Sequence, residues 1–344
     1  MVTFLPIATD RLVLRRFRVD DAEVLAAYRS DPDVARYQSW TAPYGVGAAR
    51  TLIDAQSLLD GPTRGEWIQI AIEREGELVG DVAVGLSDDG LTATIGYTVA
   101  PAHQGGGLAT EAVGAVVARL FHELAVHRVQ ASIDPRNDAS ARVVERLGFV
   151  HEGTALASVL HHGDWADDAR YALTADGHQA WWSRPTGPPV DVRLVEVSAT
   201  NVHDVLQLST HPTQRHFVAP MAASFADAFA PEWIDGAPVV PWARAIEADG
   251  DLVGFMMLAE RTEAHPEAFL WRLLIDRRHQ RRGIGTSALK LLFEQLRANG
   301  HETLLVSWHP GVGGPGPLYE RLGFVPTGEL DNDEVVARLQ LNGV

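Results

Sequence analysis

Apolar and polar residues alternate in six short stretches of the first half of the chain, which predicts β-strands with one buried face. These stretches are residues 11–15, 67–72, 78–84, 92–99, 128–133 and 165–173. Between them, apolar residues recur every three or four positions, as in amphipathic helices, in residues 22–28, 48–59, 111–125 and 140–147. Alternating strands and helices, with antiparallel hairpins at the front, predict an α/β (α+β) fold whose mixed sheet is covered by helices on both faces.

The same order returns in the second half of the chain. Strands are expected at residues 192–195, 243–247, 252–258, 269–275 and 303–308, and helices at 202–209 and 287–297. Short motifs recur at nearly constant spacing: residues 76–80 are echoed 174 residues later, and Gln104 and Gln280 are 176 residues apart. A period as long as a whole domain indicates a duplicated domain and not a solenoid.

Chain length and composition agree with two domains. A chain of 344 residues is too long for one compact core. Prolines and glycines crowd residues 184–189, a composition that stops regular structure and stiffens a linker. We therefore expect a first domain of residues 1–180, a Pro/Gly-rich linker of residues 181–190 and a second domain of residues 191–344.

The charge and residue usage exclude several classes of protein. A net charge of −16 argues against nucleic acid or an anionic membrane as partner. The sequence has no long apolar run and its start lacks the features of a signal peptide, so we expect a cytoplasmic protein without a membrane span. Zero cysteines exclude disulfides and cysteine catalysis. The histidines have no carboxylate-supported spacing, so no metal site is predicted.

Two Gly-rich turns carry the main chemical signal. Residues 280–286 read QRRGIGT and residues 104–110 read QGGGLAT, each between a predicted strand and a predicted helix. The first backbone N–H groups of a helix have no partner within it, and with the helix dipole they suit a phosphate or pyrophosphate. Glycines allow close approach of the anion to the main chain. One such turn is a weak signal, but the second copy strengthens it.

A second motif follows each turn after about forty residues: ERLGF at 145–149 and again at 320–324. With both motifs present twice, the chain resembles the GNAT superfamily of acetyl-CoA-dependent acyltransferases along nearly its whole length. The resemblance implies two tandem GNAT folds, each with a sheet whose fourth and fifth strands splay apart and hold the pantetheine arm of acetyl-CoA between them.

The resemblance also implies which residues hold acetyl-CoA. In the second domain they are Leu273, Leu274 and Ile275, which would pair with pantetheine, and Gln280, Arg281, Arg282, Gly283, Ile284, Gly285 and Thr286 on the pyrophosphate loop. In the first domain they are Thr98, Val99, Gln104, Gly105, Gly106, Gly107, Leu108, Ala109, Thr110 and Asn137.

Tyr319 of the second domain stands where the family places its general acid, and a phenol there can protonate the leaving thiolate. The alternative is a core tyrosine on an amphipathic helix. Seven residues earlier the chain has Val312, where many members have a pantetheine-binding asparagine. The general base is not legible: Glu260, Glu267 and His309 are candidates, and a chain of waters would serve equally well.

The first domain resembles the acetyltransferases of ribosomal-protein N-termini, on the strength of residues 9–15 and 95–101. In that branch Ser140 fits the candidate acid. Val144 replaces the tyrosine, and Thr94 replaces a base glutamate, so the first domain is expected to bind acetyl-CoA while catalysing weakly or not at all.

The second domain is similar to the diamine and spermidine acetyltransferases, on the strength of residues 269–276 and 327–335. The tail carries four carboxylates, which either receive a polyamine or form a solvated acidic hairpin: Glu329, Asp331, Asp333 and Glu334.

The sequence thus predicts an N-acetyltransferase that moves acetyl from acetyl-CoA to a small-molecule or peptide amine, chiefly in its second domain. The alternatives are N-terminal acetylation of peptides by the first domain, and an acetyl-CoA-sensing module with a silent site. A monomer or a homodimer is compatible with either.

Overall fold

The computed structural model describes residues 3–234 and 236–343. Their contacts divide the chain into two compact units, Met1–Ser183 and Arg184–Val344, which we call the first and second domains. Helix α6 continues to Ser183, so residues 181–183 of the expected linker are helical and the connection begins at Arg184.

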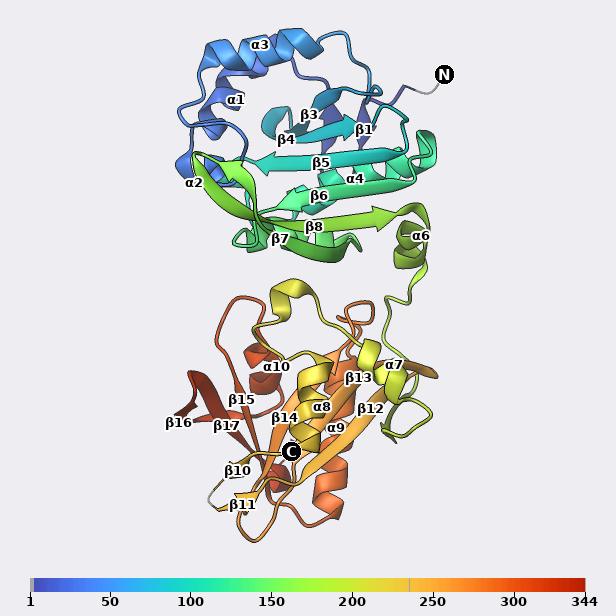
Figure 1. The fold of residues 1–344 in the computed structure, drawn as a ribbon, viewed down its shortest axis with the longest axis vertical. Coiled ribbons are helices and arrows are strands. Elements are labelled where there is room, and N and C mark those ends of the chain that lie inside the picture. The colour runs from blue at the N-terminus through green and yellow to red at the C-terminus, as the bar shows by residue number, and fades with distance from the viewer. Residues whose placement is uncertain (1–2, 235, 344) are drawn as a thin grey trace. The chain divides into compact units, whose positions relative to one another are not determined.

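The first domain is built on an eight-stranded sheet in the order β1-β2-β3-β4-β5-β6-β8-β7 (Figure 1). All neighbours are antiparallel except β5 and β6. The strands are β1 (Ile7–Ala8), β2 (Val13–Arg15), β3 (Trp67–Arg74), β4 (Glu77–Leu86), β5 (Thr92–Val99), β6 (Arg128–Ile133), β7 (Val150–His161) and β8 (Asp164–Thr174). The α-helices are α1 (Ala22–Arg29), α2 (Pro32–Ala35), α3 (Val46–Gln56), α4 (Leu108–Glu123), α5 (Asp138–Arg146) and α6 (Ala175–Ser183).

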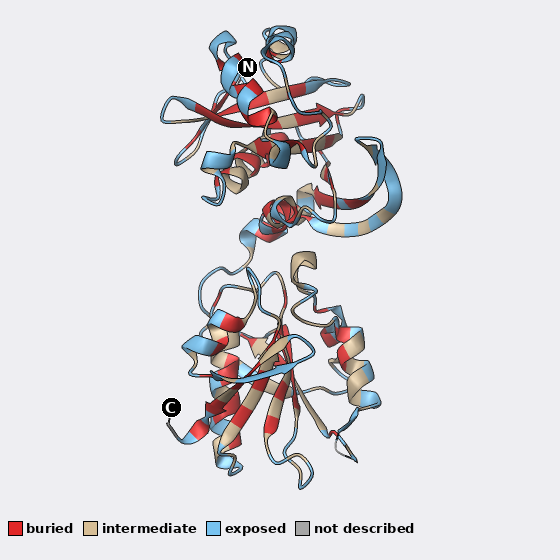
Figure 2. Cartoon of the chain, turned by 90° about the vertical axis from the view of Figure 1, so that its left-hand side faces the viewer, coloured by how far each residue is buried: buried red, intermediate tan, exposed pale blue. Residues whose placement is uncertain are grey.

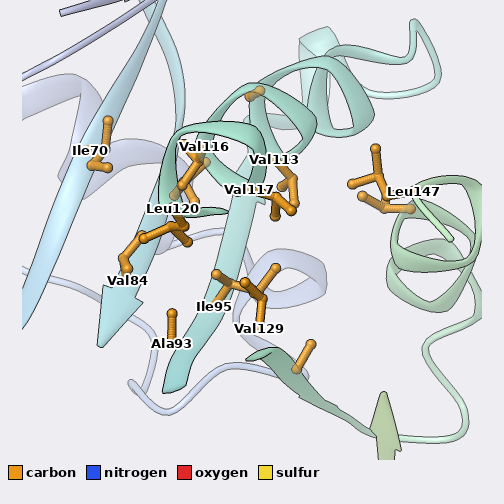
Figure 3. Close-up of a cluster of buried hydrophobic side chains, with 14 of the residues drawn as sticks. Ile70, Val84, Ala93, Ile95, Val113, Val116, Val117, Leu120, Val129 and Leu147 are labelled. Atoms are coloured by element: carbon orange, nitrogen blue, oxygen red, sulfur yellow. The ribbon is translucent and has the colours of Figure 1, made fainter. Parts of the chain in front are cut away.

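Helix α4 covers one face of this sheet because its apolar side chains recur at helical spacing. Figure 3 shows this face, on which residues of α4 point toward β5 and β6: Val113, Val116, Val117 and Leu120. They are fully or almost fully buried. Helices α1 and α3 contribute Leu25 and Ile53 to a separate cluster with Ala71 of β3. Both faces of the sheet are therefore covered, as the alternation predicted.

The second domain is built on a seven-stranded sheet in the order β16-β17-β15-β14-β13-β12-β9. Its strands are β9 (Val192–Glu196), β12 (Pro241–Ala248), β13 (Asp251–Ala259), β14 (Ala268–Ile275), β15 (Thr303–Trp308), β16 (Val325–Asp331) and β17 (Glu334–Gln340). A separate pair is formed by β10 (Trp233–Ile234) and β11 (Ala237–Pro238). The α-helices are α7 (Val202–Gln207), α8 (Met221–Phe229), α9 (Ile284–Ala298) and α10 (Gly316–Arg321). Read from β2 and from β9, the two main sheets have the same strand order, which agrees with a duplicated domain.

Buried residues of the second domain also form two layers. One cluster joins α9 to the sheet through Leu289, Leu292 and Phe293, and the other joins α7 and α8 to the opposite face through Val205 and Met221. Figure 2 shows the buried residues of each domain gathered along the strands and the inner sides of the helices. The fold class expected from the sequence, two mixed sheets covered by helices, is confirmed.

In each domain the one parallel strand pair separates after three residues. Strand β5 pairs with β6 only over Thr92–Thr94, although both strands continue. Strand β14 pairs with β15 only over Ala268–Leu270. These are the splayed strands that the family resemblance implied. In the second domain alone, the register of β13 against β14 skips Trp271, a β-bulge that increases local twist.

Several elements were not predicted from the sequence: β7, α8, α10 and β16. Strand β7 lies at the edge of its sheet and is mostly exposed or half-buried, so it lacks the buried alternation that marks a strand. Helix α10 has only six residues and follows a Gly/Pro loop, which gives too few turns for a visible helical period.

Candidate active sites

The two Gly-rich loops have the same backbone conformation. Gly105 and Gly107 have φ angles of 77° and 78°, and the equivalent Arg281 and Gly283 have 64° and 80°. All four residues therefore adopt the left-handed conformation that favours glycine. Arg281 adopts it at a cost in strain, because an arginine carries a Cβ. The loop geometry is thus a property of the duplicated fold and not of the glycine count.

Each loop leads into a helix whose first turn is left without a cap. Gly107 and Gly283 are the N-caps of α4 and α9, and neither offers a side-chain acceptor to the helix amides. A Cβ built on Gly105, Gly106 or Gly283 meets no atom within 4 Å. The exposed N–H groups face open space, as a pyrophosphate site requires. The predicted residues of these first turns are Leu108, Ala109, Thr110, Ile284, Gly285 and Thr286.

The two glutamines occupy equivalent positions in their loops and have a structural role. Gln104 Nε2 donates a hydrogen bond of 2.9 Å to the Val99 carbonyl, and Gln280 Nε2 donates one of 3.1 Å to the Ile275 carbonyl. Each side chain therefore closes the loop onto the end of its own preceding strand. The sequence predicted that both glutamines bind the cofactor. In the structure, their amides bind the carbonyl at the end of the preceding strand.

The first domain ties its loop to the N-terminal segment through Glu111 in the first turn of α4. This carboxylate accepts hydrogen bonds from the Thr9 hydroxyl (2.6 Å) and from the Arg11 side chain (2.7 Å). Arg11 also donates to the Gly106 carbonyl at 2.9 Å. Burial raises the pKa of Glu111, but the hydrogen bonds from Thr9 and Arg11 outweigh it and the pKa is lowered. Apart from the family-like run at residues 9–15, nothing in the sequence pattern indicated these contacts of Glu111.

The second domain anchors its loop differently, and here one expectation changes. Arg282, expected to add charge beside the pyrophosphate, is 5% exposed and donates to the Gly187 carbonyl (2.9 Å) and to His279 Nδ1 (3.0 Å). Its guanidinium therefore fastens the loop to the domain. Arg281 is exposed and forms no ion pair with another described residue, so it is the arginine that remains available to an anion.

Asp276, directly after β14, completes this anchor. Its carboxylate is buried and accepts hydrogen bonds from the Ser209 N–H (3.1 Å) and from the Arg278 side chain (2.8 Å). Burial acts to raise its pKa, but the bonds from Arg278 and Ser209 prevail and the pKa is lowered.

The strand edges expected to pair with pantetheine are open on one side. Leu273, Leu274 and Ile275 pair with β13 but lie beyond the last residue that pairs with β15. Thr98 and Val99 pair with β4 and lie beyond the last residue that pairs with β6. Apart from the Val99 and Ile275 carbonyls, which accept the glutamine amides, these residues pair with no described strand on the inner side of the splay, where an extended ligand could pair.

A cavity of about 520 Å³ in the first domain brings most of its predicted residues together. Its lining includes Thr98, Val99, Gln104, Gly105, Gly107, Leu108, Ala109, Thr110, Asn137 and Ser140; Gly106 does not line it. Asn137 Oδ1 accepts the Ser140 N–H and caps α5 (3.1 Å), which leaves its Nδ2 for a ligand. Tyr97 donates to the Ser140 carbonyl at 2.7 Å and fixes the start of α5.

Tyr319 is 5% exposed and packs between Trp308 and Phe324, with both ring centroids at 5.5 Å. Its hydroxyl makes no hydrogen bond to another residue that the structure describes. Burial, with a smaller contribution from Glu334, raises the pKa of Tyr319. A phenol held protonated in this way can donate its proton. Val312, at the position of the missing asparagine, is 82% exposed in the Gly/Pro loop.

A second cavity, of about 470 Å³, lies in the second domain and contains none of the predicted cofactor residues. Its lining includes two of the base candidates, Glu267 and His309, and two of the tail carboxylates, Asp331 and Glu334. Glu260, Glu329 and Asp333 are not among its lining residues. We call it the acidic cavity.

No cluster of three metal-ligating side chains occurs among the residues described, and no described helix is long and apolar enough to cross a membrane.

Comparison with known proteins supports this description. Residues 11–150 match the family model "Acetyltransferase (GNAT) domain", and residues 203–324 match "Acetyltransferase (GNAT) family". The chain is 32% identical over 146 residues to an uncharacterised N-acetyltransferase, p20, of Bacillus licheniformis, a match that covers 42% of this chain and 82% of that protein. The chain belongs to the GNAT acetyltransferases, with one such domain in each half.

Two further proteins are similar to parts of the chain. Over 80 residues, 23% of this chain and 41% of the other, the chain is 36% identical to the ribosomal protein uS5-alanine N-acetyltransferase of Escherichia coli. A solved structure of Mycobacterium smegmatis RimJ in complex with CoA-disulfide is similar at 26% identity, covering 48% of this chain and 87% of that one, with a TM-score of 0.43.

Proposed function

We propose that this enzyme transfers the acetyl group of acetyl-CoA to a primary amine, and that the second domain performs the reaction. When bound, acetyl-CoA supplies the acetyl group as a thioester. The amine nitrogen forms a bond to the acetyl carbon, the carbon–sulfur bond breaks, and sulfur leaves with the electron pair and takes a proton. An acceptor that enters as an ammonium ion releases one proton overall.

The residues of the second domain divide this work between binding and proton transfer. The free edge of β14 at Leu273–Ile275 would align the pantetheine arm, and the uncapped amides of Ile284, Gly285 and Thr286 would hold the pyrophosphate. Arg281 would add a positive charge at the loop. Tyr319 would donate the proton that the departing sulfur needs.

The observation that carries the proposal is the combination of this loop with Tyr319. In the second domain one fold carries an open strand edge on β14, an uncapped helix α9, and on α10 a buried phenol without a hydrogen-bond partner among the described residues. The first domain has the loop but places Val144, fully buried, where the phenol would stand.

Consumption of acetyl-CoA, measured with a panel of polyamines, amino acids, aminoglycosides and peptides, tests the proposal. Wild type should acetylate at least one amine, and Gly283→Glu should abolish turnover by placing bulk and negative charge in the anion site. Gly283→Ala is the matched control, because it carries the same backbone strain without the charge. Absence of turnover by wild type on every amine would refute acetyl transfer and favour a cofactor-binding module.

The formed cavity of the first domain favours a second candidate, acetylation of a peptide N-terminus at that domain. Ser140 would then be the acid, because it lines the cavity together with the predicted cofactor residues. If Gly107→Glu abolished turnover and Gly283→Glu did not, this candidate would replace the first, and Ser140→Ala would be the next variant to assay.

A further inference from the structure

The acidic cavity lies where the splay of the second domain begins. Phe269 and Leu305, which face each other in the last paired rungs of β14 and β15, both line it, as do Trp271 and Ser307 on the separated strands. The residues between them in sequence, Leu270 and Val306 among them, belong to the core under α9. Because successive side chains of a strand point to opposite faces, the cavity opens on the face away from α9.

Tyr319 lies on the other face. It belongs to the core cluster under α9, with Trp308 and Phe324. The cavity and the phenol therefore approach the splay from opposite sides of the sheet. A base in the cavity and an acid on the other face could therefore act on different atoms of the reaction, the incoming nitrogen and the leaving sulfur.

Charged and titratable groups face the cavity from every element around it: Glu232, His265, Glu267, Arg272, Asp331 and Glu334, in addition to His309. Two of them are already engaged. Glu267 forms a bidentate ion pair with Arg338, with both distances 2.9 Å, and accepts the Thr303 hydroxyl. Arg272 pairs with Asp227 at 2.9 Å. Glu267 is therefore a weak candidate for the general base, because a carboxylate held by an arginine is a poor proton acceptor.

His309 and Glu334 lie beside each other in the lining of the cavity. His309 Nε2 lies 3.4 Å from Glu334 Oε1, and the other carboxylate oxygen of Glu334 accepts a hydrogen bond from the Ser307 hydroxyl. The serine fixes the carboxylate, and the carboxylate orients the imidazole. A histidine supported by a carboxylate in this way is a suitable general base.

The first domain contains the same serine–carboxylate pair without the histidine. Ser132 donates to Asp168 at 2.5 Å, and the pair has the same register: Asp168 lies two residues before the partner of Ser132, as Glu334 lies two before the partner of Ser307. At the position of His309 the first domain has Asp134. Hydrogen bonds from Arg136 lower the pKa of Asp134, so this carboxylate is a weak base.

We propose that the acidic cavity is the acceptor site of the second domain, that it takes a cationic primary amine, and that His309, oriented by Glu334, removes a proton from the ammonium group and so makes the amine nucleophilic. The ammonium group would be drawn in by Glu334 and Asp331. His309 takes one proton from it, becomes an imidazolium beside Glu334, and releases the proton to water after the neutral nitrogen has attacked. This inference rests on the proposed acetyl transfer and adds its acceptor and base.

The test compares His309→Gln and Glu334→Gln with wild type on an amine that wild type acetylates, over a range of pH. Removal of a positioned base should lower kcat/KM by about 10²-fold near neutral pH. The loss should shrink as the pH approaches 10, because an alkylamine with an ordinary pKa of about 10.4 then loses its proton to water without help. Glu329→Gln is the matched control: the same chemical change on the same hairpin, outside the cavity, should leave the rate unchanged.

The outcomes separate the two proposals. If wild type turns over and both variants have the same kcat/KM as Glu329→Gln, the acceptor site is overturned, whereas acetyl transfer is not. A loss that stays constant with pH would show that the pair only supports the structure, which also overturns the inference. Affinity for CoA alone, measured by calorimetry, should be unchanged in both variants, so that a fall in CoA binding would place these residues with the cofactor and contradict the proposal.

Discussion

The two domains have the same Gly-rich loop, but different carboxylate side chains hold it in place. Both loops use a glutamine amide on the last strand carbonyl and both leave the first helical turn uncapped. The first domain then fastens its loop from the α4 side, with Glu111 holding Thr9 and Arg11. The second fastens it from the strand side, with Asp276 holding Ser209 and Arg278. The Gly-rich loop thus has the same geometry in both domains, whereas the side chains that hold it in place differ.

On the reaction side the domains differ in chemistry and not only in support. The second domain has Tyr319 beneath the splay and His309 with Glu334 above it. The first domain has Val144 and Asp134 at the equivalent positions. A domain with neither a tyrosine acid nor a free base at these positions would hold a nucleotide but lack this path for proton transfer. This difference supports our proposal that binding and turnover have separated between the two copies.

The largest effect that this comparison predicts is on turnover, and its absence would contradict the comparison. Tyr319→Phe keeps the ring packing against Trp308 and Phe324 and removes only the hydroxyl, so kcat should fall by about 10²-fold while affinity for CoA stays the same. Tyr97→Phe, which removes a phenol hydroxyl from the first domain, should leave kcat unchanged. Steady-state rates of the two variants decide the matter, and an unchanged kcat for Tyr319→Phe would rule out the tyrosine as acid.

A smaller effect concerns stability. Asp276→Asn should lower the free energy of unfolding of the second domain by about 1–3 kcal/mol at neutral pH, because it weakens hydrogen bonds to a buried carboxylate. The folded-state pKa of Asp276 is lowered, so its contribution is present above the ordinary carboxyl pKa and is lost as the pH falls through the folded value. Denaturant unfolding from neutral to acidic pH checks this: wild type and variant should converge in acid. If the difference in free energy of unfolding between wild type and variant persisted in acid, the ionised carboxylate would not be what stabilises the loop.

The smallest effect sharpens the parallel between the loops. Gln104→Ala and Gln280→Ala each remove one hydrogen bond to a strand carbonyl, which should cost about 0.5–1.5 kcal/mol. Only Gln280→Ala should raise the KM for acetyl-CoA, since only the second loop serves turnover. Equal KM changes in both variants would show that the first loop takes part in the reaction.

Much of the fold could be predicted from the sequence because it depends on local periodicity. The strands at Thr92–Val99 and Arg128–Ile133 were predicted to the residue. The edge strand β7 and the short helix α10 could not be, because neither shows a period of buried residues. The bulge at Trp271 could not be seen either, since it depends on register between strands; it accounts for one of the small changes in spacing between the repeats.

The candidate site, like the fold, could be predicted from the sequence only in part. The loops and Tyr319 lie in contiguous motifs, so the sequence identifies them directly. The inward turn of Arg282 and the pairing of His309 with Glu334 bring together residues that are distant in sequence, and only the folded sheet shows them. His309 was one base candidate of three: Glu267 is held by Arg338, and Glu260 does not line the acidic cavity.

The most direct test of the separation between binding and turnover is to count CoA sites and measure rates in the same two variants, Gly107→Glu and Gly283→Glu. Calorimetry should find two CoA sites per wild-type chain and one in each variant, because each substitution places a carboxylate in one pyrophosphate site. Turnover should survive in Gly107→Glu and vanish in Gly283→Glu. Turnover lost only in Gly107→Glu would contradict the account and assign the reaction to the first domain.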